Sequence, residues 1–373
     1  MIMNINQYIS RTLINLPGFH TKRKIVVIES DDWGSVRMPS REVYEHLLKL
    51  GLNIDYLAFN KYDALASESD LNALFDVLQS VKDKNGNPVI LTANTIMANP
   101  DFEKIKASNF TEYYYESFTE TLKRYPEHSG AFELWQKGIA ENIFRPQFHG
   151  REHLNVTRWM NALSNNVGNV QLAFDLGMYD LSDRNQITEN SFVDTLNFES
   201  DSELVFQRDS IVEGLRMFEN TFGYKSTTFI APCYIWDYRL NKTLTDYGVK
   251  ALQGGWFQLE PTVGKDHKFK KRFHYTGQKN KYNQTFLVRN ISFEPSINTD
   301  LDLNNDVLKR MNFLFKMKKP VIISSHRLNY IGYIDSKNRK KNLKLFGELL
   351  QQIVKRWPDV EFMSSDKLAD IIG

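Results

Sequence analysis

Adjacent carboxylates follow the first strongly apolar run of the chain, KIVVIE, at Asp31 and Asp32. Like charges side by side raise each other's pKa, and a nearby cation relieves that cost. One carboxylate of such a pair can bind a metal while the other acts as a base. The same residue type also caps helices and forms Asx turns, so this pair alone leaves both interpretations open.

A pair of histidines follows the run FRPQF, at His149 and His153. Residues four apart lie on one face of a helical turn and can share one ion. The chain has 8 histidines in 373 residues, so a chance pair at this spacing is uncommon. Together with Asp32 they form a set of two histidines and one carboxylate, which leaves positions open for water and substrate. Glu152 is an alternative oxygen ligand or a solvated charge.

Two more candidate positions follow apolar runs later in the chain. Pro232, in Ala-Pro-Cys-Tyr, predicts a tight turn that either aims backbone N–H groups into a site or is purely structural. His326 ends the run PVIISS and is a candidate general acid, or a histidine satisfied at a strand end. The single cysteine, Cys233, excludes an internal disulfide and a multi-cysteine zinc site.

Short apolar runs alternate with longer segments of helical periodicity along the whole chain, which predicts parallel strands with helical crossovers. Seven or eight such units favour a closed or nearly closed β/α barrel, in which the loops after the strands carry the chemistry. Residues 101–135 are predicted to be a helical insertion. The predicted strands lie in 24–28, 88–91, 144–148, 170–174, 226–230, 249–252, 285–293, 320–324 and 360–363, and the predicted helices in 41–50, 70–81, 209–218, 240–247 and 343–357.

The order Asp-Asp, His-x-x-x-His, Pro-x-Tyr and Ser-Ser-His, from Lys24 to His326, resembles the polysaccharide deacetylases with the NodB homology domain, carbohydrate esterase family 4. The resemblance implies a distorted (β/α)7-type barrel with helical and loop insertions. It would form a single domain over residues 24–373, after an N-terminal extension of residues 1–23.

The resemblance also implies roles for individual residues. Asp31 would be the general base and His326 the general acid. Asp32, His149 and His153 would hold a divalent metal ion, zinc by default, with Co, Ni, Mn and Fe as the other candidates.

Other residues would contact the substrate. A backbone N–H near Tyr234 would stabilise the oxyanion, Trp33 would stack on a sugar or pack internally, and Arg327 would contact substrate.

The sequence departs from the family pattern in its third, fourth and fifth motifs. The arginine that orients the base in the family is Ala231 here, and the leucine of the acetyl pocket is Ser324. The usual Asp and Trp of the fourth motif have their nearest match at 253–256, Gln-Gly-Gly-Trp. Four arginines are candidate replacements for the missing one: Arg37, Arg145, Arg151 and Arg327.

The predicted function is metal-dependent removal of an N- or O-acetyl group from a sugar or glycan precursor. One alternative is a glycoside hydrolase on the same barrel, since such enzymes need two carboxylates flanking the scissile bond. A second alternative is a catalytically degenerate glycan-binding protein. The carboxylates that could serve a glycosidase are Asp31, Glu152, Asp175, Asp237 and Glu294.

Composition limits the partners. The formal net charge is +2, which argues against nucleic acid as the main partner. No run of about 18 apolar residues predicts a membrane span, and no leader pattern is seen, so we expect a cytoplasmic protein. The sequence leaves the oligomeric state open.

A basic run with interleaved aromatics lies at 268–275. It predicts either a solvated loop or edge hairpin, or a site that binds an anionic glycan, a nucleotide-linked sugar or another phosphate.

Overall fold

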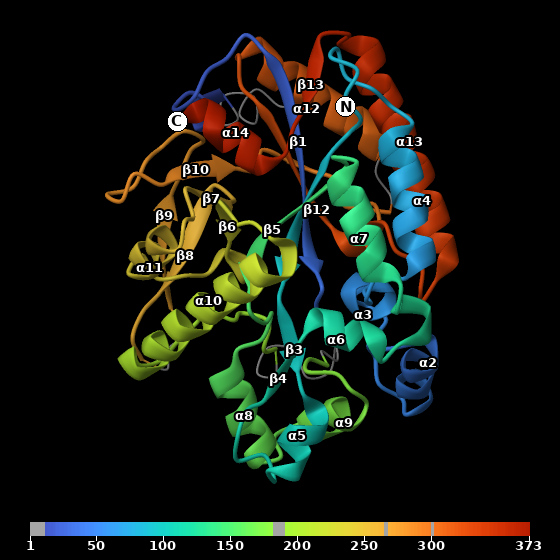
Figure 1. The fold of residues 1–373 in the computed structure, drawn as a ribbon, viewed down its shortest axis with the longest axis vertical. Helices are drawn as coiled ribbons and strands as arrows, with labels where there is room; N and C mark the ends of the chain where they lie inside the picture. Colours follow the sequence, from blue (N-terminus) through green and yellow to red (C-terminus); the bar gives the residue numbers. More distant parts are fainter. Residues whose placement is uncertain (1–11, 182–190, 265–267, 300–301) are drawn as a thin grey trace.

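The computed structural model describes residues 12–181, 191–264, 268–299 and 302–373. Its centre is a parallel sheet with the strand order β10-β7-β6-β5-β2-β1-β12-β11, drawn in Figure 1. A further strand, β13, pairs with the first half of β1. The bounds are β1 Lys24–Trp33, β2 Leu91–Ile96, β5 Phe144–Gly150, β6 Thr228–Ile230, β7 Ala251–Gly254, β10 Thr285–Val288, β11 Ile291–Ser292, β12 Val321–His326 and β13 Val360–Phe362.

One extended segment joins the two ends of this sheet. β10 pairs with β7, whereas β11, which starts three residues after β10 ends, pairs with β12. The change of partner falls at two residues: Arg289 N donates to Gly254 O, and Asn290 N donates to Ile322 O. β10 and β11 therefore occupy one place in a curled ring of seven. This arrangement is a distorted (β/α)7-type barrel, as predicted.

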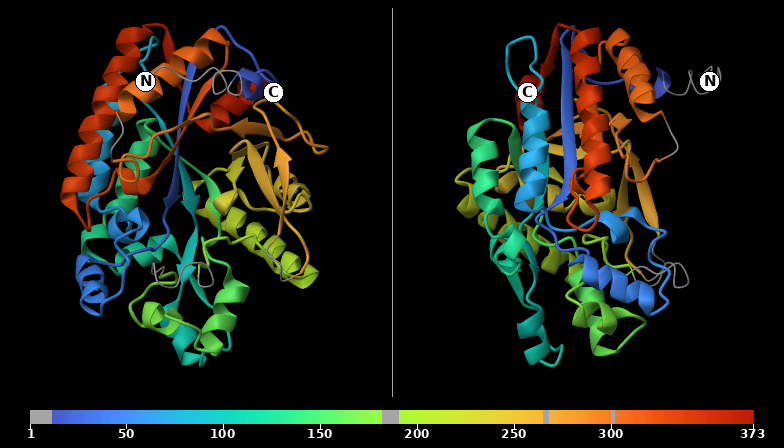
Figure 2. Two further views of the ribbon diagram at one scale, coloured as in Figure 1. Left: turned by 180° about the vertical axis from the view of Figure 1, so that it is seen from behind. Right: turned by 90° about the vertical axis from the view of Figure 1, so that its right-hand side faces the viewer.

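Helices cover the outside of the sheet, and Figure 2 shows α4 and α13 beside β1. α4 begins with a capping box in which Ser67 and Asp70 each bond the other's backbone N–H. Its buried Leu71, Leu74 and Phe75 form the apolar stripe expected of a helix that packs on a sheet. The main covering helices are α2 Arg41–Lys49, α4 Glu68–Gln79, α7 Ala131–Ala140, α10 Asp201–Phe222, α11 Leu240–Asp246, α12 Leu303–Lys316, α13 Ser336–Arg356 and α14 Ser365–Ile372.

The segments that follow β2 and β5 pack together into a small unit with its own hydrophobic cluster. The strand predicted at 170–174 is wrong, because this segment is helix α9, Val170–Asp175. Its Val170, Ala173 and Phe174 are buried at helical spacing against Trp159 of α8. The other elements here are β3 Ala98–Pro100, α5 Phe102–Ala107, β4 Tyr115–Ser117, α6 Phe118–Lys123 and α8 Val156–Ser164.

The basic run belongs to an antiparallel hairpin of β8, Phe257–Pro261, and β9, Phe269–Phe273. This hairpin follows β7 closely, and a bridge between Ile235 and Leu259 joins it to the segment after β6. Within the described ranges, no helix is both long and apolar enough to cross a bilayer.

Candidate active site

The carboxyl ends of three barrel strands bring the predicted site residues together. β1 and β12 pair in register so that Asp31 lies opposite His326. β5 is separated from β1 only by β2, and it ends at His149 and Gly150. Parallel strands end at the same rim of a barrel, so residues more than 100 positions apart become neighbours.

The candidate metal centre consists of Asp32, His149 and His153. The Asp32 Oδ1 atom lies 3.4 Å from His149 Nε2 and 3.3 Å from His153 Nε2. Potential ligand atoms of all three residues lie within 4.8 Å of one another, and all three residues are buried or nearly so. One carboxylate oxygen thus faces two imidazole nitrogens, which is an arrangement that suits a cation.

The hydrogen bonding of His149 supports a metal at this point. Its Nδ1 donates to the Ile230 carbonyl at 2.9 Å, which fixes the tautomer and leaves Nε2 as an acceptor. Nε2 is buried and has no hydrogen-bond partner among the described residues. A buried nitrogen without a donor costs free energy, and a metal ion would remove that cost. The residues therefore fit the implied ion.

A turn at the end of β1 separates the two adjacent carboxylates. Asp32 has a φ of 72°, in the left-handed region, and Gly34 has a φ of 86°. A side chain at Gly34 would meet the Ile96 carbonyl oxygen at 2.4 Å, so only glycine fits there. This turn lets Asp31 face the barrel interior while Asp32 faces the histidines.

An arginine that the sequence analysis did not single out holds Asp31. Arg289 Nη1 and Nη2 donate to the two Asp31 oxygens at 2.6 Å each, and Nε donates to Glu29 at 2.6 Å. Burial alone would raise the pKa of Asp31, but Arg289 outweighs it and lowers that pKa to about 2. Asn94 Nδ2 also donates to Asp31, at 2.7 Å. Asp31 is therefore ionised and oriented.

None of the four arginines proposed as replacements does this. Arg145 binds Asp366 on α14, and Arg151 binds Glu152. Arg327 is fully buried and donates to Asp63, so its side chain is closed off from the solvent from which a substrate would arrive. The remaining candidate, Arg37, lies 3.7 Å from the Asp63 carboxylate and 5.6 Å from the ring centroid of Phe59.

Glu294, which the sequence analysis named only as a candidate glycosidase carboxylate, orients His326. Its Oε1 accepts from His326 Nδ1 at 2.7 Å, while Nε2 points towards Asp31, 3.9 Å from Oδ2. Burial lowers the pKa of His326, but Glu294 outweighs it and raises that pKa to about 10. The segment 253–256, Gln-Gly-Gly-Trp, has no carboxylate that could hold His326. Gln253 instead accepts a hydrogen bond from Asn94 inside the barrel.

Tyr234 reaches the site through its side chain. Its backbone N–H donates to the Ala231 carbonyl at 3.0 Å within the turn after β6, so that N–H is already used. Its hydroxyl lies 3.2 Å from Arg289 Nη1. The structure thus puts the Tyr234 hydroxyl beside Arg289, and oxyanion binding by a backbone N–H near Tyr234 stays a prediction.

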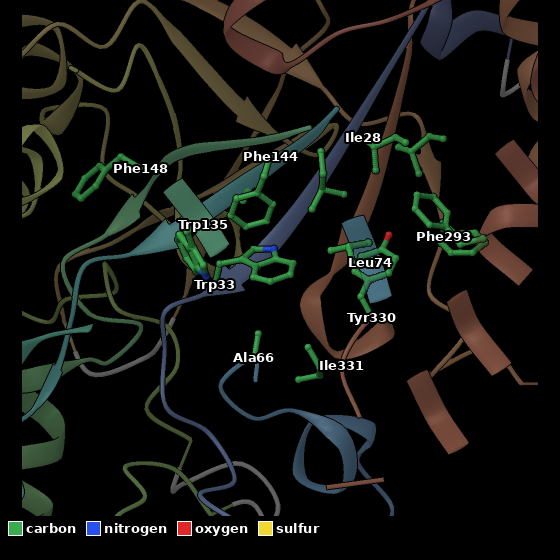
Figure 3. Packing of buried hydrophobic residues seen from close by; sticks show 14 of the residues in the cluster. Ile28, Trp33, Ala66, Leu74, Trp135, Phe144, Phe148, Phe293, Tyr330 and Ile331 are labelled. Atoms are coloured by element: carbon green, nitrogen blue, oxygen red, sulfur yellow. The ribbon is translucent and has the colours of Figure 1, made fainter. Parts of the chain in front are cut away.

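Trp33 packs in the core, as the second of its two predicted roles requires. It is 1% exposed, and Figure 3 shows its indole beside Trp135 and Phe144. The rings make edge contacts at centroid distances of 6.1 and 5.0 Å, and Nε1 donates to Ser30 Oγ. No face of the ring is open to a sugar in this arrangement.

We therefore expect Trp33→Phe to change stability and leave the metal centre intact. The loss of one buried hydrogen bond and part of the ring should lower the free energy of unfolding by about 1–3 kcal/mol. Urea unfolding and metal analysis of the same preparation would check this. Unchanged stability combined with weaker sugar binding would contradict the core assignment.

Comparisons with known proteins identify no sequence relative, since no family model and no curated protein matches the chain. Solved structures do resemble it. A putative polysaccharide deacetylase from Mycobacterium smegmatis is 11% identical, with a TM-score of 0.44 over 96% of this chain and 93% of that one. A probable polysaccharide deacetylase from Pseudomonas aeruginosa is 9% identical, with a TM-score of 0.44 over 94% and 91%. A 4-alpha-glucanotransferase from Thermococcus litoralis is 8% identical, with a TM-score of 0.44; 92% of this chain matches 40% of that longer one.

Proposed function

We propose that this protein is a metal-dependent hydrolase that removes an N- or O-acetyl group from a sugar or glycan precursor. The observation that carries the proposal is the cluster of Asp32, His149 and His153, buried beside an ionised carboxylate and an imidazole held by Glu294. Asp32, His149 and His153 would hold the ion, zinc by preference. A divalent ion bound there would acidify a water molecule and polarise the substrate carbonyl.

The chain's own residues would move the protons. Asp31 Oδ2 would accept the proton of the attacking water, with the carboxylate fixed by Arg289. His326 Nε2 would give its proton to the leaving amine or alkoxide, with the ring fixed by Glu294. The Tyr234 hydroxyl, which accepts a hydrogen bond from Arg289 Nη1, would donate its proton to a substrate oxygen.

The starting protonation states favour this division of roles. The pKa of Asp31 is lowered to about 2, so at pH 7 this carboxylate is free to accept a proton. The pKa of His326 is raised to about 10, so at pH 7 this imidazole carries the proton that it must give away. A base and an acid whose environments push their pKa values apart form the usual pattern of an acid–base pair.

Metal content of the purified protein tests the proposal. After equal exposure to zinc, the native chain should hold about one metal per molecule and His149→Ala should hold far less. His46→Ala is the control, because His46 is exposed on α2. The proposal would fail if neither the native chain nor the control bound metal.

A glycosidase is the second candidate, and it rests on Asp31 and Glu294. His326 contacts both of these carboxylates, whereas the other three candidates are engaged elsewhere. Glu152 pairs with Arg151, Asp175 with Lys106, and Asp237 with Arg239. The mass change of a treated glycan separates the two activities, since loss of acetyl differs from chain shortening. Metal binding and glycan binding without either change would indicate a non-catalytic protein.

A further inference from the structure

The hairpin of β8 and β9 extends the wall of the barrel next to the candidate site. β7 ends at Gly254, at the rim that carries the site, and β8 begins at Phe257. Figure 1 places both hairpin strands beside β7, on the side of the barrel away from α13. The rear view in Figure 2 shows the same hairpin unobstructed by helices.

The two faces of the hairpin differ in burial. On the inner face, Gln258 and Glu260 are buried; Gln258 donates to the Trp236 carbonyl, and Glu260 accepts from Arg272. The register pairs Phe257 with Phe273 and Leu259 with Lys271. We call these last four residues the outer face, because side chains two apart on a strand share a side.

The outer face exposes aromatic rings. Phe257 is 48% exposed and Phe273 is 40% exposed, with 5.8 Å between their ring centroids. Trp256 lies parallel to Phe273, at 8° and 6.3 Å. Exposed rings grouped in this way are common where a protein binds a ligand with apolar faces.

The outer face begins next to the candidate site. Gly255 lies two residues before Phe257, with a bend at Trp256 between them. A Cβ atom built on Gly255 would lie 3.5 Å from the Tyr234 ring. The Tyr234 hydroxyl in turn lies 3.2 Å from Arg289, which holds Asp31. A chain leaving the metal centre over Tyr234 would therefore meet the exposed rings next.

The hairpin also carries excess positive charge. Lys270, Lys271 and Lys279 are exposed, and no acidic partner is found for them in the ranges that the structure describes. The nearby Glu260 is used by Arg272. Unpaired cations beside a binding surface attract a ligand of opposite charge.

We infer that the outer face of the hairpin binds an extended glycan chain bearing uronate carboxylates, whose acetylated sugar lies at the metal centre. Sugar rings would lie against Phe257 and Phe273, and a carboxylate would lie near Lys271, which shares their face of the hairpin. The inference rests on the proposed function for the position of the acetyl group, but glycan binding itself can be measured without turnover.

The experiment compares two hexasaccharides that both contain N-acetylglucosamine: hyaluronan, which carries carboxylates, and chitin, which is neutral. Calorimetry in dilute salt should give the hyaluronan hexasaccharide at least about tenfold higher affinity, falling in 0.2 M salt. Lys271→Glu should weaken its binding about tenfold. Lys270→Glu, on the opposite face of the same strand, and Lys340→Glu, exposed on α13, make the same charge change and should have little effect.

The aromatic contribution is tested by Phe257→Ser with Phe273→Ser, which should weaken both hexasaccharides roughly fivefold. Thermal melting of each variant shows that it is folded. Binding retained in metal-free His149→Ala would support the glycan surface even if the proposed hydrolase activity fails.

Three results would overturn the inference. The first is equal affinity for the two hexasaccharides, or affinity that the hairpin variants do not change. The second is hairpin-dependent binding to vesicles rich in phosphatidylglycerol with no binding of hyaluronan, which would identify a membrane surface. The third is a dimer in solution that Phe257→Ser with Phe273→Ser dissociates, which would identify a second copy of the chain as the occupant.

Discussion

Replacing Arg289 with methionine is expected to lower the free energy of unfolding by about 3–5 kcal/mol at pH 7 and to abolish measurable turnover. Arg289 is 3% exposed and neutralises two carboxylates, Glu29 and Asp31, that are themselves buried. Removing one partner of a buried ion pair leaves uncompensated charge in a region of low dielectric constant. Urea unfolding measures the first effect, and deacetylation of an acetylated sugar measures the second.

Two further variants separate the charge of Arg289 from its geometry. Arg289→Lys keeps the charge but loses the forked hydrogen bonds to Asp31, so it should be more stable than the methionine variant and still turn over slowly. Glu29→Gln added to Arg289→Met removes one of the two stranded carboxylates and should recover part of the lost stability. Arg41→Met is the control, since the Arg41–Glu45 pair is exposed on α2. A double variant no more stable than Arg289→Met would contradict the account.

Replacing Glu294 with glutamine is expected to lower the pKa of His326 from its raised value of about 10 and to shift the alkaline limb of kcat/KM to lower pH. Burial opposes the charged imidazole, and the Glu294 carboxylate is the main group that outweighs it. The proton donor would then be lost at pH 8, with a fall in rate of about 10²-fold or more there. NMR titration of the His326 imidazole follows the same change without a substrate.

The same pair predicts how stability depends on pH. The pKa of His326 is higher in the folded chain, about 10, than its ordinary value of 6.5. The folded state therefore binds this proton more tightly, and the stabilisation is complete below about pH 6.5 and lost as the pH rises towards 10. The native chain should lose more stability than Glu294→Gln over that interval. Parallel loss in both proteins would show that His326 does not depend on Glu294.

Neither Arg289 nor the contact of Glu294 with His326 was predicted, and both omissions have one reason. Arg289 lies within the run 285–293 and Glu294 directly follows it, and the apolar pattern identifies this run only as a strand. After Arg289 the backbone stops pairing with β7 and begins to pair with β12, and this change of partner directs the guanidinium towards Asp31. Ala231, where the resemblance would place an arginine, is 58 residues away in sequence, so spacing alone could not suggest Arg289 as the replacement.

The sequence by itself determined the parts of this protein that depend on local order. Apolar runs followed by polar residues identified most barrel strands, and the spacing of His149 and His153, with Asp32 at an earlier strand end, identified the candidate metal centre. The strand inference succeeds because strand burial is a property of neighbouring residues. The predicted helical turn at His149 and His153 is wrong, because His149 ends β5 and His153 lies in the irregular segment that follows it.

Only the tertiary structure decided which charged groups meet across the barrel. Register and ring closure decide that Arg289, and not Arg37, holds Asp31. They also decide that Glu294 holds His326 and that Trp33 packs in the core and not on a substrate surface. The physical reason is that a buried charge is tolerated only beside an opposite charge or a hydrogen-bonding group. In a closed sheet, the order and register of the strands decide which residue provides that group.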